Sequence, residues 1–254
     1  MCGTCGCGKP DHHHEHDHGT MHHTHHDDSE SRRISVEIDL LDKNRAFAAE
    51  NRRWFEDHGI FTLNMVSSPG SGKTTLLVEM IKAQADKFEV SVIEGDQQTS
   101  LDADRIVAAG ARAHQINTGN LCHLDAHMVG HAVEHLSPAD GSIVVVENVG
   151  NLICPAAFDL GEHCRVALIS VTEGEDKPLK YPQMFVSSQV VIINKCDLLP
   201  HLDFDLERCR EHIRHINPQA TIFELSASTG DGMCEWLQWL EQQRTAMVNE
   251  EACA

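Results

Sequence analysis

From residue 60 onward, short apolar runs alternate with stretches whose apolar residues recur every three or four positions. The short runs predict β-strands, and the helical spacing predicts α-helices. The predicted strands are Phe61–Val66, Phe88–Ile93, Ser142–Val146, Val166–Val171, Val190–Ile193 and Thr221–Leu225. The predicted helices are residues 73–86, 101–109, 122–136, 204–215 and 232–243. This alternation is typical of an α/β fold with a doubly wound, mostly parallel sheet.

The residues before this region follow different patterns. Residues 1–30 hold almost no apolar side chains, so they cannot offset their chain entropy by burial, and we expect a disordered tail. Residues 31–58 predict an amphipathic helix that Gly59 stops. Its apolar positions are Ile38, Leu41, Phe47, Ala48 and Trp54. Residues 59–254 then form one domain, whose last ten residues we expect to fray.

The composition narrows the class of protein. The chain has 39 Asp and Glu against 20 Lys and Arg, which argues against nucleic-acid binding because phosphates require clustered cations. No apolar run approaches the roughly 20 residues of a membrane span, and the first 30 residues lack the apolar core of a signal peptide. We therefore expect a cytoplasmic protein. Thiols stay reduced there, so the ten Cys indicate metal binding, catalysis or packing before disulfides.

A glycine-rich segment follows the first predicted strand. It reads Ser67-Ser68-Pro69-Gly70-Ser71-Gly72-Lys73-Thr74-Thr75. A strand, a Gly-rich loop, Lys-Thr and a helix are the context of a phosphate-binding loop, or P-loop. Gly70 and Gly72 allow backbone N–H groups to turn inward, Lys73 would reach the β- and γ-phosphates, and the Thr74 hydroxyl would bind Mg²⁺. Ser67 replaces the usual first Gly, so a plain surface turn is the alternative and a second signal is needed.

That second signal follows the strand at residues 190–193. Asn194-Lys195-Cys196-Asp197 resembles the Asn-Lys-x-Asp guanine motif of GTPases. The Asp197 carboxylate can accept from guanine N1–H and the 2-amino group, a donor pair that adenine lacks. Asn194 would tie the base and phosphate loops together, and the stem of Lys195 would lie across the ring. Ser226-Ala227 resembles the loop that offers an N–H to guanine O6. The prediction is GTP over ATP.

Acidic residues at two strand ends are candidates for the magnesium site. Asp96 follows the second predicted strand, and Glu147 follows a run of three Val. Such carboxylates lie at the sheet edge where α/β proteins bind ligands, beside the Mg²⁺ on Thr74. We assign Thr74, Asp96 and Glu147 to Mg²⁺, and Lys73 and Asp96 to catalysis; capping or solvated acids are the alternative. No catalytic Gln or arginine finger can be assigned, so we expect slow hydrolysis.

The Cys and His residues form two groups. At the N-terminus, Cys2, Cys5 and Cys7 offer three soft ligands for Ni²⁺ or Zn²⁺, and nine His follow between His12 and His26. The alternative for the thiols is a redox-sensitive cluster, and a purification tag is the trivial explanation of the His run. Inside the domain, Cys122 and His123 are expected to open a helix, with Cys154 after the Glu147 strand. Spacing alone favours small buried hydrophobes over ligands for these internal cysteines.

Taken together, the motifs resemble the hydrogenase nickel-incorporation GTPases (HypB), accessory proteins for the [NiFe]-hydrogenase centre. The segments that carry the resemblance are Cys2–Cys7, the His-rich tail, Ser68–Thr74, Glu94–Gln98, Asn117–His123, Glu147–Pro155, Glu175–Pro182 and Asn194–Asp197. They cover essentially the whole chain.

The resemblance implies a dimerising GTPase related to signal-recognition and septum-placement proteins. It implies a high-affinity nickel site on Cys2, Cys5 and Cys7, and a nickel or zinc site on Cys122, His123 and Cys154 near a dimer interface. It also implies partners: the zinc-containing nickel chaperone HypA, a nickel-binding prolyl isomerase and the hydrogenase large-subunit precursor. The expected function is a GTPase whose nucleotide cycle gates nickel delivery. A urease-type accessory GTPase, a nickel or zinc storage protein and a redox sensor are the alternatives.

Overall fold

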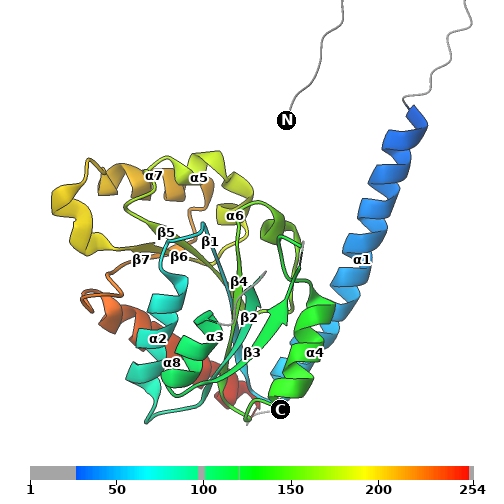
Figure 1. The fold of residues 1–254 in the computed structure, drawn as a ribbon, viewed down its shortest axis with the longest axis horizontal. Helices are drawn as coiled ribbons and strands as arrows, with labels where there is room; N and C mark the ends of the chain where they lie inside the picture. Colours follow the sequence, from blue (N-terminus) through cyan, green and yellow to red (C-terminus); the bar gives the residue numbers. More distant parts are fainter. Residues whose placement is uncertain (1–26, 97–100, 120, 252–254) are drawn as a thin grey trace, which may run out of the picture. The chain divides into compact units, whose positions relative to one another are not determined.

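The computed structural model describes residues 27–96, 101–119 and 121–251 (Figure 1). The chain divides into two compact units, residues 1–38 and 39–254. The division falls within helix α1 (Asp27–Asp57), which ends just before Gly59 with its φ of 59°. Residues 27–30 of the predicted tail are helical, whereas the expected disorder of residues 1–26 lies outside the described residues.

The second unit is built on one parallel sheet. Within the described residues its strands are β1 (Phe61–Ser67), β2 (Val90–Asp96), β3 (Arg112–Asn117), β4 (Ile143–Gly150), β5 (Cys164–Ser170), β6 (Val190–Asn194) and β7 (Thr221–Glu224). They lie in the order β3-β2-β4-β1-β5-β6-β7, and every neighbouring pair is parallel. The predicted α/β class with a doubly wound sheet is therefore confirmed. The chain passes from β1 to β2 and β3 on one side, returns to place β4 beside β1, and then crosses to β5, β6 and β7 on the other side. The loop after β1 therefore lies at the switch point where such sheets bind ligands.

The sequence pattern missed one strand. β3 is the edge strand beyond β2, and its residues are all partly or fully exposed. Only Ala113 and Ile116 are apolar in it, so no apolar run marks it. An edge strand that is not buried on both faces does not need such a run.

The helices cover both faces of the sheet. They are α2 (Lys73–Gln84), α3 (Leu101–Ala108), α4 (Ala126–Leu136), α5 (Lys177–Lys180), α6 (Pro182–Val186), α7 (Leu206–Ile216) and α8 (Met233–Glu251), with 3₁₀ turns η1 (Cys154–Ala157) and η2 (Cys196–His201). α8 extends through most of the residues we expected to fray, so that prediction is wrong. α4 begins at Ala126 because the Asp125 side chain accepts from the Met128 N–H at 2.8 Å and caps the helix. The expectation that Cys122 and His123 open this helix is therefore also wrong; they precede it.

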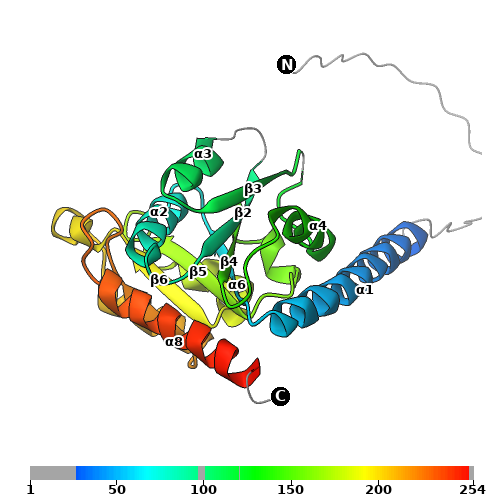
Figure 2. The same ribbon diagram turned by 90° about the horizontal axis from the view of Figure 1, so that it is seen from below.

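Side chains that alternate along the strands feed separate cores. Val145 of β4 packs in the core that α2, α3 and α8 cover, while its neighbours Val144 and Val146 pack toward α4. Figure 2 shows α8 and α4 on opposite sides of the sheet. The residues of α1 from Asp39 onward belong to the α4 side, where Phe55 is fully buried. α6 and α7 cover the same face over β5 and β6, through Phe185 and Ile213.

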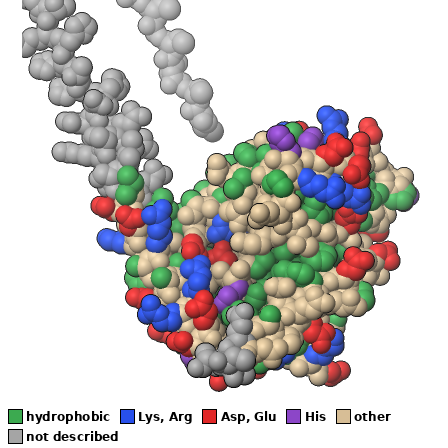
Figure 3. Space-filling model, turned by 180° about the vertical axis from the view of Figure 1, so that it is seen from behind, with side chains coloured by type: hydrophobic (Ala, Val, Ile, Leu, Met, Phe, Trp, Pro, Cys, Tyr) green, Lys and Arg blue, Asp and Glu red, His purple; other side chains and the backbone are tan. Residues whose placement is uncertain are grey.

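The surface drawn in Figure 3 mixes charges of both signs, and hydrophobic side chains gather in its middle. None of the described helices combines the length and the apolar character that a bilayer crossing requires.

Candidate functional site

The loop after β1 surrounds a cavity of about 620 Å³ at the carboxyl edge of the sheet. Two of its glycines have positive φ, 77° at Gly70 and 100° at Gly72. A Cβ on Gly72 would lie 2.6 Å from Asn194 Nδ2, whereas a Cβ on Gly70 would meet nothing within 4 Å. Predicted site residues that line the cavity are Pro69, Gly70, Ser71, Gly72, Lys73, Thr74, Thr75, Asp96, Glu147 and Lys195.

Ser67, the departure from the usual P-loop pattern, contacts the loop lysine. Its Oγ accepts a hydrogen bond from Lys73 Nζ at 2.9 Å and donates to the Ser68 carbonyl at 2.7 Å. Burial lowers the pKa of the Lys73 ammonium, while the nearby carboxylates of Glu147 and Asp102 act in the opposite direction. The hydroxyl thus gives a buried cation a partner that glycine could not supply.

Buried carboxylates lie next to the first turn of α2. The Thr74 hydroxyl donates to Glu147 Oε1 at 2.9 Å, and Glu147 Oε2 and Glu94 Oε2 are buried without a hydrogen-bond partner among the described residues. Burial raises the pKa of Glu147, and burial together with repulsion from Glu147 raises that of Glu94 to about 8. Uncompensated carboxylate oxygens beside a hydroxyl fit a hard divalent cation such as Mg²⁺. Our sequence prediction chose Asp96 and passed over Glu94, although both line the cavity.

The guanine-motif residues meet the phosphate loop through one amide. Asn194 Nδ2 donates to the Ser71 carbonyl at 2.9 Å, and Asn194 Oδ1 accepts from the Ala227 N–H at 3.1 Å. Lys195, with a φ of 61°, donates from Nζ to the Gly70 carbonyl at 2.6 Å. The half-buried Asp197 lies in η2, one strand away from the buried Ser226. The structure therefore brings the segments at residues 67–75, 194–197 and 226–227 to one sheet edge.

Two cationic residues near the loop were not predicted. Lys177 Nζ donates to Ser68 Oγ at 3.1 Å and pairs with Glu173 at 3.2 Å. Arg105 of α3 lines the cavity and contacts Thr75 Oγ1 at 3.4 Å. Lys177 lies in a segment that carries the family resemblance, which is the signal that could have identified it; no spacing rule marks Arg105.

The predicted internal thiols and imidazole also come together. Cys122 Sγ lies 2.8 Å from Cys154 Sγ and 3.7 Å from His123 Nδ1, and the three ligand atoms lie within 4.8 Å of one another. Burial lowers the pKa of His123, which keeps its imidazole neutral, and the hydrogen bond to Cys154 raises the pKa of Cys122. Two sulfurs and a neutral nitrogen suit a borderline or soft ion such as Ni²⁺ or Zn²⁺. Cys2, Cys5 and Cys7 lie outside the described residues.

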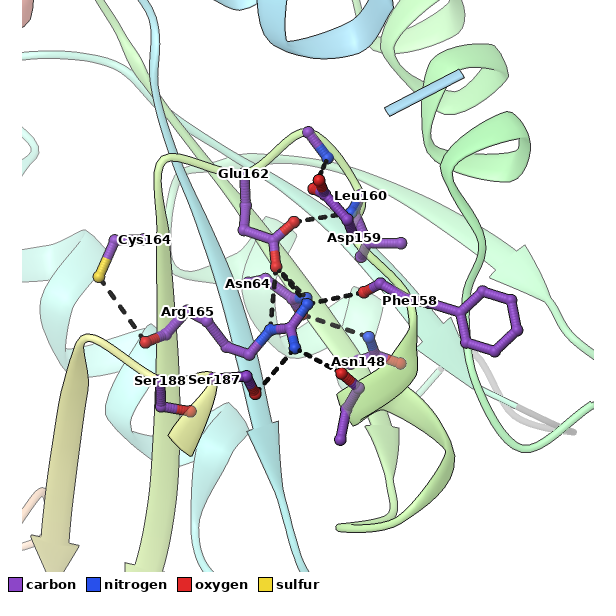
Figure 4. Close-up of polar contacts among 12 residues, drawn as sticks. Asn64, Asn148, Phe158, Asp159, Leu160, Glu162, Cys164, Arg165, Ser187 and Ser188 are labelled. Atoms are coloured by element: carbon purple, nitrogen blue, oxygen red, sulfur yellow. Dashed lines mark hydrogen bonds and ion pairs between the residues drawn. The ribbon is translucent and has the colours of Figure 1, made fainter. Parts of the chain in front are cut away.

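A buried arginine holds the loop that carries Cys154 (Figure 4). Arg165 pairs with Glu162 at 2.7 Å, and both side chains are less than one tenth exposed, at 7% and 6%. The guanidinium also donates to the carbonyls of Ala156 at 3.0 Å and Phe158 at 2.7 Å. The Phe158 ring stacks on His123, with ring centroids 3.9 Å apart. The Arg165–Glu162 pair therefore fixes the position of Phe158, the residue on which His123 stacks.

The same network reaches the nucleotide cavity. Asn64 donates to Glu162 Oε1 at 3.0 Å and accepts from Asn148 Nδ2 at 3.2 Å (Figure 4). Asn148, the chain neighbour of Glu147, accepts from the Leu124 N–H at 3.3 Å through Oδ1. Asn148 thus connects Glu147, the carboxylate beside Thr74, to Leu124, which follows His123 of the thiol site.

Known proteins are similar to this chain in sequence and in fold. The CobW/HypB/UreG nucleotide-binding domain model matches residues 61–224. Hydrogenase maturation factor HypB of Rhizobium leguminosarum bv. viciae is 62% identical over 213 residues, which are 84% of this chain and 71% of that protein. HypB of Escherichia coli strain K12 is 54% identical over 218 residues, 86% of this chain and 75% of its own.

Solved structures agree. HypB from Helicobacter pylori, crystallised in complex with nickel, has a TM-score of 0.75 at 39% identity and covers 80% of this chain and 96% of its own. HypB from Archaeoglobus fulgidus has a TM-score of 0.75 at 37% identity, with 80% and 99% covered. The chain therefore belongs to the CobW/HypB/UreG nucleotide-binding family, among its hydrogenase maturation factors of the HypB type.

Proposed function

We propose that the chain is a GTPase that binds Ni²⁺ and uses its nucleotide cycle to gate nickel delivery to the [NiFe]-hydrogenase large-subunit precursor. The observation that carries this proposal is the hydrogen bond from Leu124 to Asn148, because it joins the loop of the thiol site to the strand that ends beside Thr74. The relatives are named hydrogenase maturation factors, and the Helicobacter pylori protein was crystallised with nickel.

The residues of the cavity divide the work of hydrolysis. When bound, Mg²⁺ would neutralise charge on the phosphates, held by Thr74 with Glu147 and Asp96 around its waters. Lys73 would exchange the Ser67 hydroxyl for the β- and γ-phosphates. Asp96 would orient the attacking water. Positioning and charge neutralisation are the main contributions, so a slow intrinsic rate follows until a partner or a conformational change improves the geometry.

Selection of guanine would rest on the base loops. Asp197 would accept from N1–H and the 2-amino group, and the N–H groups at residues 226–227 would face O6. The stem of Lys195 would cover the ring. Asn194 keeps these loops in register with the phosphates through Ser71 and Ala227, so base recognition and phosphate binding would act together.

Coupling to the metal site would pass through Leu124. Its backbone is bound to Asn148, and its side chain packs on Gly95, where an added Cβ would approach Leu124 to 2.9 Å. Gly95 lies between Glu94 and Asp96 at the end of β2, and Asn148 lies near the end of β4. Leu124 therefore contacts the ends of both strands that line the nucleotide cavity. Loss of the γ-phosphate would change the charges these strand ends must balance, and a shift of Leu124 would move His123 against Cys122 and Cys154.

The wider assembly follows the family. Cys2, Cys5 and Cys7 would form the tight N-terminal nickel site, with the His-rich tail as a reservoir, while the internal site takes Ni²⁺ or Zn²⁺. A nucleotide- or metal-dependent homodimer, HypA, a prolyl isomerase and the hydrogenase precursor would be the partners. We also propose a cytoplasmic location, where thiols stay reduced and available to a metal.

A nickel titration tests the gating. The full-length chain carrying Cys2, Cys5 and Cys7→Ser is titrated with GDP and with a non-hydrolysable GTP analogue. We expect Ni²⁺ affinity of the internal site to differ at least fivefold between the two nucleotides. Asn148→Ala should shrink that difference, while Asn217→Ala, which removes hydrogen bonds to Phe185 and Ser188 instead, should leave it intact. Equal affinity with both nucleotides would overturn the proposal.

Catalysis is tested separately. Lys73→Ala should abolish GTP turnover in a phosphate-release assay while the N-terminal cysteines keep their tight Ni²⁺ binding. Loss of both properties would contradict a protein with separate nucleotide and metal modules. Which nickel enzyme stays immature in a deletion strain separates the hydrogenase role from the urease role.

A further inference from the structure

Helix α1 holds both segments of the thiol site through two asparagines. Asn44 and Asn51 lie seven residues apart, so they project from one face of the helix. Asn44 Oδ1 accepts from the Ala126 N–H at 2.8 Å, and its Nδ2 donates to the Asp159 carbonyl at 2.7 Å. Asn51 Nδ2 donates to the Ala126 carbonyl at 2.8 Å and to the Leu160 carbonyl at 3.0 Å. Each asparagine therefore connects the start of α4 to the loop after η1.

The two connected segments carry the rings that stack at the thiol site. Ala126 comes three residues after His123, and Asp159 follows Phe158 directly. The centroids of the His123 and Phe158 rings are 3.9 Å apart. Cys154 lies at the start of η1, immediately before this loop. The asparagines thus set the distance between the segment that carries His123 and the segment that carries Cys154.

These contacts are close and shielded from water. Asn44 is 6% exposed, and Ala126 is fully buried. The Ala126 N–H belongs to the first turn of α4 and has no partner within the helix, so Asn44 supplies the acceptor that burial requires. An added Cβ on Gly161 would lie 2.6 Å from a backbone oxygen of α1, and one on Gly130 would lie 2.8 Å from Asn51 Oδ1. The packing leaves the two segments little room to shift against α1.

We propose that Asn44 and Asn51 are positioning residues of the thiol site, which keep His123 within reach of an ion bound by Cys122 and Cys154. Groups behind the ligands fix ligand orientation, and their loss typically lowers metal affinity about tenfold or more. The inference rests on the proposed function in taking these three residues as ligands, but it requires neither GTP turnover nor gating. Residues 39–57 of α1 are therefore part of the metal site's support.

Cobalt binding to the full-length chain tests this role. Co²⁺ held by thiolates gives a charge-transfer absorption band, which the histidine-rich tail does not produce. The chain carries Cys2→Ser, Cys5→Ser and Cys7→Ser, and GDP is present throughout. We expect Asn44→Ala and Asn51→Ala each to weaken Co²⁺ binding about tenfold and to change the ligand-field bands, because the imidazole is displaced. Cys154→Ser should abolish the charge-transfer band.

Two further variants separate positioning from a general loss of stability. Asn217→Ala removes hydrogen bonds to the carbonyls of Phe185 and Ser188, so it should leave Co²⁺ affinity and spectrum unchanged. Gly130→Ala keeps both asparagines and raises the helix propensity of α4, but its methyl displaces Asn51. We expect it to weaken Co²⁺ binding severalfold while GDP affinity is unchanged.

The possible failures are distinguishable. Unchanged Co²⁺ affinity in the two asparagine variants, or in Gly130→Ala where they do not fold, would overturn the positioning role. A loss in Asn217→Ala as large as theirs would do the same. A chain with all its asparagines that gives no thiolate band would instead refute the thiol site, and with it the proposed nickel binding by Cys122 and Cys154.

Discussion

Replacing either P-loop glycine by alanine should separate backbone strain from the effect of a collision. Gly70 and Gly72 both have positive φ, so an alanine at either position strains the backbone in a similar way. The surroundings differ: the new methyl at Gly70 meets nothing within 4 Å, but at Gly72 it would lie 2.6 Å from Asn194 Nδ2. Gly70→Ala is therefore the matched control for Gly72→Ala.

The magnitude follows from the contacts of Asn194. The left-handed backbone costs about 1–2 kcal/mol in either variant. In Gly72→Ala the displaced amide also loses its bonds to the Ser71 carbonyl and the Ala227 N–H, each with a net contribution of about 1 kcal/mol. We expect the free energy of unfolding to fall by about 1–2 kcal/mol in Gly70→Ala and by about 3–4 kcal/mol in Gly72→Ala.

Urea denaturation followed by tryptophan fluorescence measures the unfolding free energies, and a fluorescent GDP analogue measures affinity for the folded proteins. Displacement of Asn194 in Gly72→Ala should also weaken GDP binding by the folded protein roughly tenfold or more, because Asn194 connects the base loops to the phosphate loop. Equal destabilisation by the two variants, or unchanged GDP affinity in Gly72→Ala, would refute the bridging role of Asn194.

Other substitutions test individual buried groups. Burial lowers the pKa of His163 to about 4. The free energy of unfolding is therefore highest above the ordinary histidine pKa near 6.5, and it falls as the pH drops from there through 4. His163→Gln should remove up to about 3 kcal/mol of this pH-dependent loss, measured by urea titrations between pH 7 and 4. Glu162→Gln leaves the Arg165 charge uncompensated and should cost about 3–5 kcal/mol of unfolding free energy by thermal or urea denaturation. The pKa of Glu94, raised to about 8 by burial and by Glu147, makes the nucleotide-free protein lose stability as the pH rises from about 4.5 to 8; Glu94→Gln should abolish that loss, and an unchanged pH slope would contradict it.

Local patterns predicted the fold where burial is complete. β1, β4 and β6 are buried along most of their length, so each appears in the sequence as an apolar run. β3 escaped because an edge position does not require such a run. The start of α4 was misplaced because Cys122 and His123 continue the apolar spacing, although Asp125 is a recognisable cap.

The candidate site was predictable only where its chemistry is local in sequence. The P-loop and the Asn-Lys-x-Asp segment each place their groups within a few residues. The link from Arg165 through Glu162 and Asn64 to Asn148 joins three strands and a loop, and it depends on strand order and register. Nothing in the spacing of isolated Asn residues reveals such a network. The meeting of Cys122 with Cys154 has the same origin, which is why the family resemblance identified it and spacing alone did not.

Ser67 affects the nucleotide-free state that the protein passes through between GDP release and GTP binding. A buried ammonium without a partner costs several kcal/mol, so a cavity that loses GDP normally has a poorly stable empty state. Here the Lys73 ammonium has the Ser67 hydroxyl at 2.9 Å to return to. We expect the empty protein to be a viable species that releases GDP and takes up GTP without an exchange factor. The supply of the active form would then follow the ratio of the two nucleotides in the cell.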